Sequence, residues 1–261
     1  NIFWSFASLA ISISLLYFLF SAILKNKLTI YNIEFISLFQ TFEKKNKNNL
    51  LIMNLENLRD KTAKILLDIK SINIQTKKPF KLTSGRLSPV YVDCRKIISH
   101  LKERRSIINM TSKLLKKEID LKKIDYIAGG ETAGIPYASW ISEKLNKPMI
   151  YIRKKPKGFG KLSQIEGDIK KKSRVLLIED LSTDGKSKIN FCNAIKKAGC
   201  EIRDIFVIFN YDIYSDTIFK KNKLKLHFLT NWKFVIKHLK KKKSFKNEEI
   251  LKIEKFISKK I

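Results

Sequence analysis

Hydrophobic positions follow two different periods from residue 53 onward. Apolar side chains recur at helical spacing in residues 55–69 and 103–118. Short apolar runs typical of buried strands occupy residues 126–128, 149–152, 175–178 and 205–209. Two further helices are expected, one at residues 136–145 and one that follows the third strand and ends at Gly199. Alternation of this kind predicts an α/β fold with a mostly parallel central sheet flanked by helices.

Polar sequence follows the third predicted strand directly. Glu179 and Asp180 come first, and the run LSTDGKS then leads to the next helix. Ligands of parallel sheets bind beyond the carboxyl ends of the strands, and backbone N–H groups at a helix N-terminus bind anions. The segment therefore predicts a phosphate site, in which the acids suit sugar hydroxyls or a positive charge at an anomeric carbon. In an alternative interpretation the segment is an acidic turn without a ligand, in which Ser182 or Thr183 caps the helix.

Two other polar segments carry candidate chemistry. Residues 83–89, TSGRLSP, predict a tight turn that precedes an extended piece at residues 90–93. Residues 153–161, RKKPKGFGK, follow the second predicted strand, and Gly158 and Gly160 give them conformational freedom. Cations on such a segment suit a leaving group that gains negative charge, but a solvated basic loop is an equally simple interpretation.

The composition excludes some classes of protein and leaves one question open. The three cysteines form no CxxC pair and no cluster with the three histidines, so neither a disulfide framework nor a zinc site is indicated, and a reducing cytoplasm fits. The formal net charge is +30, carried mostly by lysines scattered along the whole chain. We interpret this charge as a compositional habit and expect no nucleic-acid partner, although a basic surface that attracts small anions remains an alternative.

The N-terminal segment does not match the rest of the chain. Residues 2–24 contain no charge and are long enough to cross a bilayer as a helix, with the following residues in the cytoplasm. A buried or interfacial helix is a second interpretation. We favour a third, in which the natural protein starts near Met53. We therefore divide the chain into an extension, residues 1–52, and a catalytic domain, residues 53–261.

Several motifs resemble one enzyme family. IEDLSTDGKS is similar to the phosphoribosyl pyrophosphate motif of type I phosphoribosyltransferases. SGRLSPVYVDCRK, GGETAGIPYA and YIRKKPKGFGKLSQIEG, in this order, resemble orotate phosphoribosyltransferases. The resemblance runs from about Leu55 to near the end of the chain. It implies a small N-terminal hood over the base site and transfer of a phosphoribosyl group to orotate, giving orotidine 5′-monophosphate and pyrophosphate in UMP synthesis.

The resemblance also implies roles for individual residues. Glu179 and Asp180 would hold the ribose hydroxyls, and Arg153, Lys154 and Lys157 would reach pyrophosphate. Lys157 and Asp180 are the expected catalytic residues. The residues expected to hold the 5′-phosphate are Leu181, Ser182, Thr183, Asp184, Gly185, Lys186 and Ser187. The residues expected to contact orotate are Thr183, Arg86 and Tyr91.

The resemblance further implies a cofactor and a partner. Mg²⁺ is expected to bind mainly through phosphoribosyl pyrophosphate, without direct protein ligands. A homodimer is expected, in which the mobile basic loop serves the neighbouring subunit. The competing predictions are a purine phosphoribosyltransferase and a regulator without catalytic activity that binds both phosphoribosyl pyrophosphate and nucleic acid.

This chain departs from the common pattern of the family at several positions. An arginine that is usual after the fourth strand is absent from FNYDIYSD. In the family a lysine precedes SGR, a basic residue lies within GGETAG, a histidine is frequent in the mobile loop and a small residue is usual in the phosphate loop. The residues found here are Thr83, Ala133, Phe159 and Lys186. The departures indicate a variant of the family.

Overall fold

The computed structural model describes residues 29–81, 87–157, 164–213, 217–241 and 246–258. The chain divides into two compact units, Asn1–Asn54 and Leu55–Ile261. Helix α2, Thr29–Asp68, begins in the first unit and ends in the second. No helix within the described ranges is long and apolar enough to cross a membrane. The apolar residues 2–24 lie outside those ranges, so the interpretations of this segment stay predictions.

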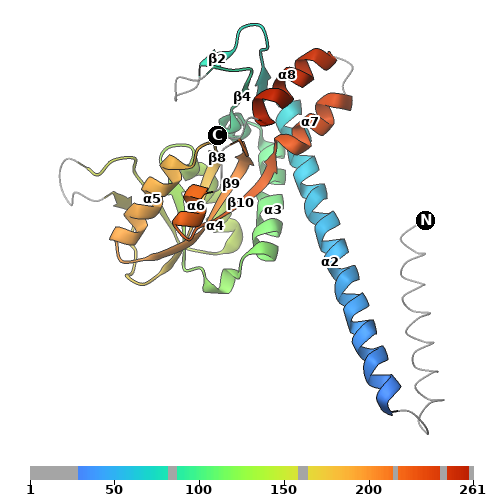
Figure 1. Ribbon diagram of the computed structural model, residues 1–261. Coiled ribbons are helices and arrows are strands. Elements are labelled where there is room, and N and C mark those ends of the chain that lie inside the picture. Colours follow the sequence, from blue (N-terminus) through green and yellow to red (C-terminus); the bar gives the residue numbers. More distant parts are fainter. Residues whose placement is uncertain (1–28, 82–86, 158–163, 214–216, 242–245, 259–261) are drawn as a thin grey trace. The chain divides into compact units, whose positions relative to one another are not determined.

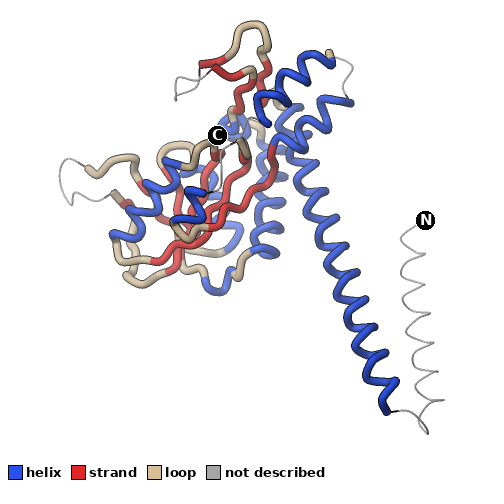
Figure 2. Tube along the Cα trace, viewed as in Figure 1, coloured by secondary structure: helices blue, strands red, loops and turns tan. Residues whose placement is uncertain are grey.

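A six-stranded sheet forms the centre of the second unit (Figures 1 and 2). Its strand order is β10-β9-β8-β5-β6-β7, and all neighbours are parallel except β6 and β7. The bounds are β5 Tyr126–Gly130, β6 Met149–Ile152, β7 Ile165–Glu166, β8 Arg174–Ser182, β9 Glu201–Asn210 and β10 Lys225–Asn231. The predicted mostly parallel sheet is confirmed, and all four predicted strands lie within observed ones.

Strand β8 is longer than its apolar run predicts. The sequence indicated a turn from Leu181 onward, but pairing with β9 continues to Ser182, which lies opposite Asn210. Glu179 lies opposite Val207 in the same register. The prediction of an early turn is wrong because backbone hydrogen bonds to a neighbouring strand do not depend on apolar side chains. Both acids are therefore fixed on the strand itself.

Helices cover both faces of the sheet. Their bounds are α3 Leu101–Glu118, α4 Gly134–Leu145, α5 Lys186–Lys197, α6 Thr217–Lys221, α7 Trp232–Lys241 and α8 Asn247–Ser258, with short 3₁₀ helices η1 Cys94–Ser99 and η2 Leu121–Lys123. Along β8, Leu176 and Ile178 belong to a core with α3, α4, α7 and α8, whereas Val175 and Leu177 belong to a core with α5 and α6. Alternate side chains of one strand thus hold two layers of helices together.

Two small antiparallel ladders precede α3 in the chain. Strand β1, Ile72–Ile74, pairs with β4, Val90–Val92, and β2, Phe80–Lys81, pairs with β3, Leu87–Ser88. The extended piece predicted before Asp93 corresponds to β4. The backbone N–H of Val92 donates to the hydroxyl of Tyr211 at 3.0 Å. This bond ties the ladders to the residue that follows β9.

A buried histidine joins three elements on the outer part of the sheet. The His227 side chain on β10 is fully buried, and its Nδ1 lies 2.6 Å from Glu118 Oε2 on α3. Its Nε2 lies 2.9 Å from Asp204 Oδ1 on β9. Burial lowers the pKa of His227, but the hydrogen bonds to the two acids outweigh burial and leave it raised. Arg59 also pairs with Glu118, at 3.4 Å. The protonated ring therefore stabilises the contact of α3 with the sheet.

We expect His227→Gln to lower the free energy of unfolding by about 2 kcal/mol at about pH 6, because two partly buried carboxylates lose their cation. A raised histidine pKa gives stability that is full below the unfolded pKa of about 6.5 and disappears as the pH rises through the folded pKa. The loss should therefore be smaller at about pH 9. Urea unfolding at both pH values measures it.

Lys240→Gln serves as the control for this substitution. It removes an ion pair with Glu254 in which the lysine side chain is 57% exposed, so a change below about 0.5 kcal/mol is expected. An equal loss for His227→Gln at both pH values would contradict a charged imidazole.

Candidate active site

The sheet reverses its direction of growth between β5 and β8. From β5 the chain passes through α4 to β6 on one side, and from β8 it passes through α5 to β9 on the other side. Such a switch point opens a crevice beyond the carboxyl ends of the two strands. Residues 131–133 and 183–185 follow those ends. The phosphate site predicted from the sequence thus falls at the point of the sheet where a ligand is expected.

The acid pair on β8 is buried. Glu179 is 5% exposed and Asp180 is 9% exposed. Lys188, in the first turn of α5, places its Nζ 3.1 Å from Glu179 Oε2. Burial raises the pKa of Glu179, Lys188 opposes this rise and Asp180 adds to it, with the result that the pKa is about 7. Burial also raises the pKa of Asp180, again against the effect of Lys188. The acid pair is therefore close to taking up a proton at neutral pH.

Two glycines of GGETAG pack against the second carboxylate oxygen of Glu179. A Cβ atom added at Gly130 or at Gly134 would overlap Oε1, and the one at Gly130 would also lie 2.5 Å from the ring of Phe191. Among the described residues this buried oxygen has no hydrogen-bond donor. The glycines thus provide the room that the Glu179 carboxylate occupies at the end of β5.

The turn after β8 leads into the N-terminus of α5. Gly185 is the N-cap residue at φ +76°, and a Cβ at this position would lie 2.6 Å from the ring of Phe219. Capping by Ser182 or Thr183 is therefore wrong, because Ser182 still belongs to β8. N–H groups of a first helical turn have no acceptor within the helix. Lys186 N–H donates to Asp184 Oδ1 at 3.1 Å, so the anion site expected at this first turn stays a prediction.

Lys186 departs from the family pattern, and the structure explains why it is tolerated. Its side chain is 81% exposed, and its Nζ lies 3.8 Å from Asp184 Oδ2. The long side chain therefore extends away from the buried acids. Since only its backbone N–H belongs to the turn, a lysine at this position leaves the turn intact.

The predicted pyrophosphate cations lie at the carboxyl end of β6. Lys157 Nζ is 2.6 Å from Glu166 Oε1 on β7, and Arg153 Nη1 is 3.8 Å from the same oxygen. Arg153 N–H also donates to the carbonyl of Gln164 at 2.8 Å. Lys154 N–H donates to Glu131 Oε2 at 2.7 Å. Glu166 thus binds two of the three predicted cations on the outer strand of the sheet.

The orotate prediction can be placed only in part. Arg86, Thr83 and Phe159 lie outside the described residues. Tyr91 is half-buried on β4, and its hydroxyl accepts a hydrogen bond from Arg95 Nη2 at 3.1 Å. Arg95 Nε donates to Asp93 at 2.7 Å, and burial raises the pKa of Asp180 against a small opposing effect of the Arg95 charge. The structure therefore brings Tyr91 and a cation near the acid pair.

Sequence reasoning missed three charged residues of this region. Lys188, Arg95 and Glu166 received no role, although YVDCRK and QIEG were recognised as motifs. A lysine at the third position of α5 gives a usable signal, because it lies one turn from residues that face the sheet. Sequence alone does not reveal that its ammonium group is buried.

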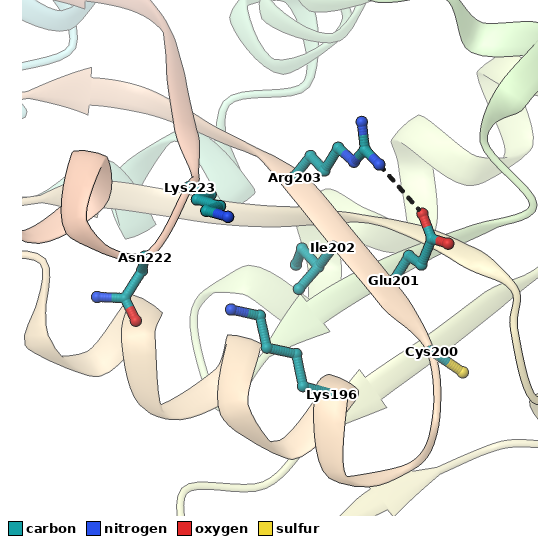
Figure 3. A pocket seen from close by; sticks show the side chains of 7 residues that line it. All are labelled: Lys196, Cys200, Glu201, Ile202, Arg203, Asn222 and Lys223. Carbon is teal, nitrogen blue, oxygen red and sulfur yellow. Dashed lines mark ion pairs between the residues drawn. The ribbon is translucent and has the colours of Figure 1, made fainter.

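A pocket of about 520 Å³ lies at the amino end of β9, whereas the acid pair lies near the carboxyl end of β8 (Figure 3). Its lining residues are Lys196, Cys200, Glu201, Ile202, Arg203, Asn222 and Lys223. The pocket contains none of the predicted site residues, and it adjoins the amino ends of the strands. Within the described part of the chain, no three His, Cys, Asp or Glu side chains gather as metal ligands would.

No family model matches the chain, but curated proteins do. Orotate phosphoribosyltransferase of Rhizobium rhizogenes is 41% identical over 198 residues, which are 75% of this chain and 85% of that protein. Orotate phosphoribosyltransferase of a Jannaschia species is 42% identical over 199 residues, which are 76% of this chain and 87% of that protein. Similarity of this degree extends over most of each relative.

Solved structures show the same fold. UMP synthase of Leishmania donovani has a TM-score of 0.65 at 26% identity and covers 76% of this chain and 42% of its own. Orotate phosphoribosyltransferase of Aeropyrum pernix has a TM-score of 0.59 at 23% identity, with 69% of this chain and 99% of its own covered. The predicted type I phosphoribosyltransferase fold is confirmed.

We expect Gly130→Ala to lower the free energy of unfolding by about 1–3 kcal/mol, because the added methyl group overlaps the Glu179 carboxylate and the Phe191 ring. In a Glu179→Ala background the same substitution should cost less, since one of the two obstacles is gone. Urea unfolding of the two single variants and the double variant gives the coupling. Additive losses would show that Glu179 does not occupy this space.

Proposed function

Because the chain belongs to the orotate phosphoribosyltransferase family, we propose how its residues divide the work of that reaction. The chain transfers the 5-phosphoribosyl group from phosphoribosyl pyrophosphate to orotate, giving orotidine 5′-monophosphate and pyrophosphate. The rival predictions, a purine enzyme and a regulator that binds nucleic acid, are not supported by these relatives. The feature that carries the assignment of roles is the acid pair beside the open first turn of α5.

The acid pair and the turn bind the two ends of one sugar phosphate. Glu179 and Asp180 accept hydrogen bonds from the ribose hydroxyls, and the turn at residues 183–187 binds the 5′-phosphate through backbone N–H groups. The order along the chain suits this division, because the acids lie near the carboxyl end of β8 and the turn after Ser182 leads into α5. Negative charge on the acids also stabilises positive charge as it develops at C1 of the ribose.

Cations stabilise the leaving group. As the bond from C1 to the pyrophosphate oxygen breaks, the electron pair stays on that oxygen, and Arg153, Lys154 and Lys157 neutralise the charge. The ring nitrogen of orotate then forms the new bond to C1, and the proton that this nitrogen loses passes to an oxygen of the departing pyrophosphate. Thr183, Tyr91 and Arg86 are the proposed orotate contacts. Arg95 supports Tyr91, because its guanidinium group donates to the Tyr91 hydroxyl.

Mg²⁺ is the proposed cofactor, bound mainly through oxygens of phosphoribosyl pyrophosphate. Phosphate oxygens are ligands that this ion prefers, and it adds positive charge to the leaving group. The residues fit this arrangement, because one carboxylate oxygen of Glu179 is already paired with the Lys188 ammonium group and is therefore not available as a direct ligand of the ion. We also propose a cytoplasmic location, which suits three cysteines that are all free thiols.

The purified chain should convert orotate and phosphoribosyl pyrophosphate to orotidine 5′-monophosphate when Mg²⁺ is present. Loss of orotate absorbance measures the rate, and adenine and hypoxanthine serve as control bases. Chelation of Mg²⁺ should lower the rate, because the leaving charge loses a counter-ion. No turnover of orotate by the folded chain would refute the assignment, and turnover of adenine instead would favour a purine enzyme.

We further propose a homodimer in which the basic segment after β6 serves the neighbouring subunit. Lys157 lies on this segment, and in the structure it pairs with Glu166 rather than with the acids of β8. A lysine that acts on the partner's pyrophosphate has no need to reach its own acid pair. In this arrangement each site takes Asp180 from one subunit and Lys157 from the other.

Mixed dimers test this arrangement. Lys157→Ala and Asp180→Asn should each reduce kcat strongly, because one removes leaving-group stabilisation and the other removes a ribose contact. Co-expression of the two variants in equal amounts should recover about a quarter of wild-type activity, since half of the dimers then contain one intact site. Each variant alone is the control. No recovery in dimers shown to be mixed would place Lys157 on the same subunit as the acids it serves.

A further inference from the structure

Lys188 is a buried cation that the assignment of roles above does not use. Its side chain is 8% exposed and extends from the first turn of α5 toward Glu179 on β8. Its Nζ lies 3.1 Å from Glu179 Oε2 and 3.2 Å from the hydroxyl of Ser187. Lysine is rarely buried unless it is paired, because removal of its charge from water is costly. The position of this ammonium group therefore requires an explanation.

The surroundings of Lys188 contain more negative than positive groups. Glu179 pairs with it from β8. The charge of Lys188 also opposes the rise that burial causes in the pKa values of Asp180 and of the Cys94 thiol at the start of η1. The other cations near the acids are Lys154, which acts on Glu179, and Arg95, which acts on Asp180. Lys154 is exposed and the Arg95 side chain is 57% exposed, so solvent screens both. Lys188 is the buried counter-ion of the acid pair among the described residues.

One carboxylate oxygen of Glu179 has a partner within the described residues and the other has none. Oε2 faces Lys188, whereas Oε1 is buried beside Gly130 and Gly134 without a donor from the described residues. A buried acceptor without a donor is uncommon in proteins, and it indicates a partner supplied from outside the chain. A hydroxyl group is such a donor, provided that the carboxyl group is ionised.

We propose that Lys188 is a positioning residue for phosphoribosyl transfer, whose buried ammonium group favours the ionised form of Glu179 and fixes one of its oxygens so that the acid pair can accept the ribose hydroxyls. The inference rests on the proposed role of the acids. Without the cation, two adjacent buried carboxylates repel each other and Glu179 retains a proton. A protonated Glu179 offers fewer acceptor sites to ribose, so binding of the activated sugar becomes dependent on pH.

Three variants test the proposal by titration calorimetry with phosphoribosyl pyrophosphate and Mg²⁺. At about pH 7, Lys188→Met should weaken binding by about fivefold, because a rise of about one unit in the Glu179 pKa, from about 7, lowers its ionised fraction from about one half to about one tenth. At about pH 9 most of this loss should disappear, since Glu179 ionises without help. Lys188→Arg keeps the cation and should bind nearly as the wild type does. Lys196→Met, an exposed lysine on the same helix, is the matched control and should change nothing.

The pH dependence separates this role from others. A loss of affinity in Lys188→Met that is equal at both pH values would overturn the proposal, because a direct contact with the substrate does not depend on Glu179. Wild-type affinity at about pH 7 would overturn it as well. Turnover of orotate by the wild type is measured separately, so a failure of the proposed reaction is distinguished from a failure of this inference.

A second measurement applies if Lys188→Met folds poorly. At about pH 9, where Glu179 ionises without the cation, the variant should lower Tm, because an unpaired carboxylate remains buried. Glu179→Gln added to it should recover most of the loss, since a neutral amide needs no counter-ion. Urea and thermal unfolding both report this coupling. Absence of any recovery in the double variant would show that the ion pair is not the reason for the burial of Lys188.

Discussion

Two adjacent carboxylates at the end of a buried strand are the constraint on which the site depends. Glu179 and Asp180 lose most of their contact with water because β8 lies between β5 and β9. Such a pair is stable only if a cation is fixed beside it and the backbone leaves space for it. Lys188 supplies the cation. Gly130 and Gly134 supply the space, and the positive φ of Gly185 starts α5 where Lys188 can return to the strand.

The cations at the carboxyl end of β6 obey a different rule. Arg153, Lys157 and Glu166 are each between a fifth and about a third exposed, so solvent screens their ion pairs. Pairs of this kind contribute only about 0–1 kcal/mol and exchange partners at little cost. A phosphate group that carries more charge than a carboxylate can therefore replace Glu166. The proposed site thus combines buried, fixed charges at β8 with more exposed, exchangeable charges after β6.

The sequence predicted the parts of the fold that repeat a simple pattern. The four predicted strands and the helices between them were confirmed, because β5, β6, β8 and β9 each contain a short apolar run. Strand β10, α7 and α8 were missed, since KLHFLTN mixes polar and apolar residues and the lysine-rich helices after it resemble solvated segments. The small ladders were missed except for β4, because two or three residues carry no periodic signal.

The candidate site was predicted less evenly. Motifs located the acids, the turn and the basic segment, because their order along the chain is distinctive. Helical spacing places Lys188, but not Lys186, on the side of α5 that carries Phe191 and Cys192, yet a lysine at such a position is equally able to extend its ammonium group to solvent, so burial of that group could not be predicted. The pairing of Lys157 with Glu166 joins residues on either side of a loop, and such pairing depends on the antiparallel contact of β7 with β6.

The formal net charge of +30 acts over longer distances than the ion pairs of the site do. Both substrates are anions, so a positive surface raises their rate of encounter with the protein. At physiological salt, however, fields from exposed lysines decay within about 8 Å, and they add little to the energy of a bound transition state. Discrimination between sugar, phosphate and leaving group must therefore come from charges that solvent does not screen. In the described part of the chain Glu179, Asp180 and Lys188 are such charges at the proposed site, so the proposed chemistry depends on these few buried ions more than on the many exposed ones.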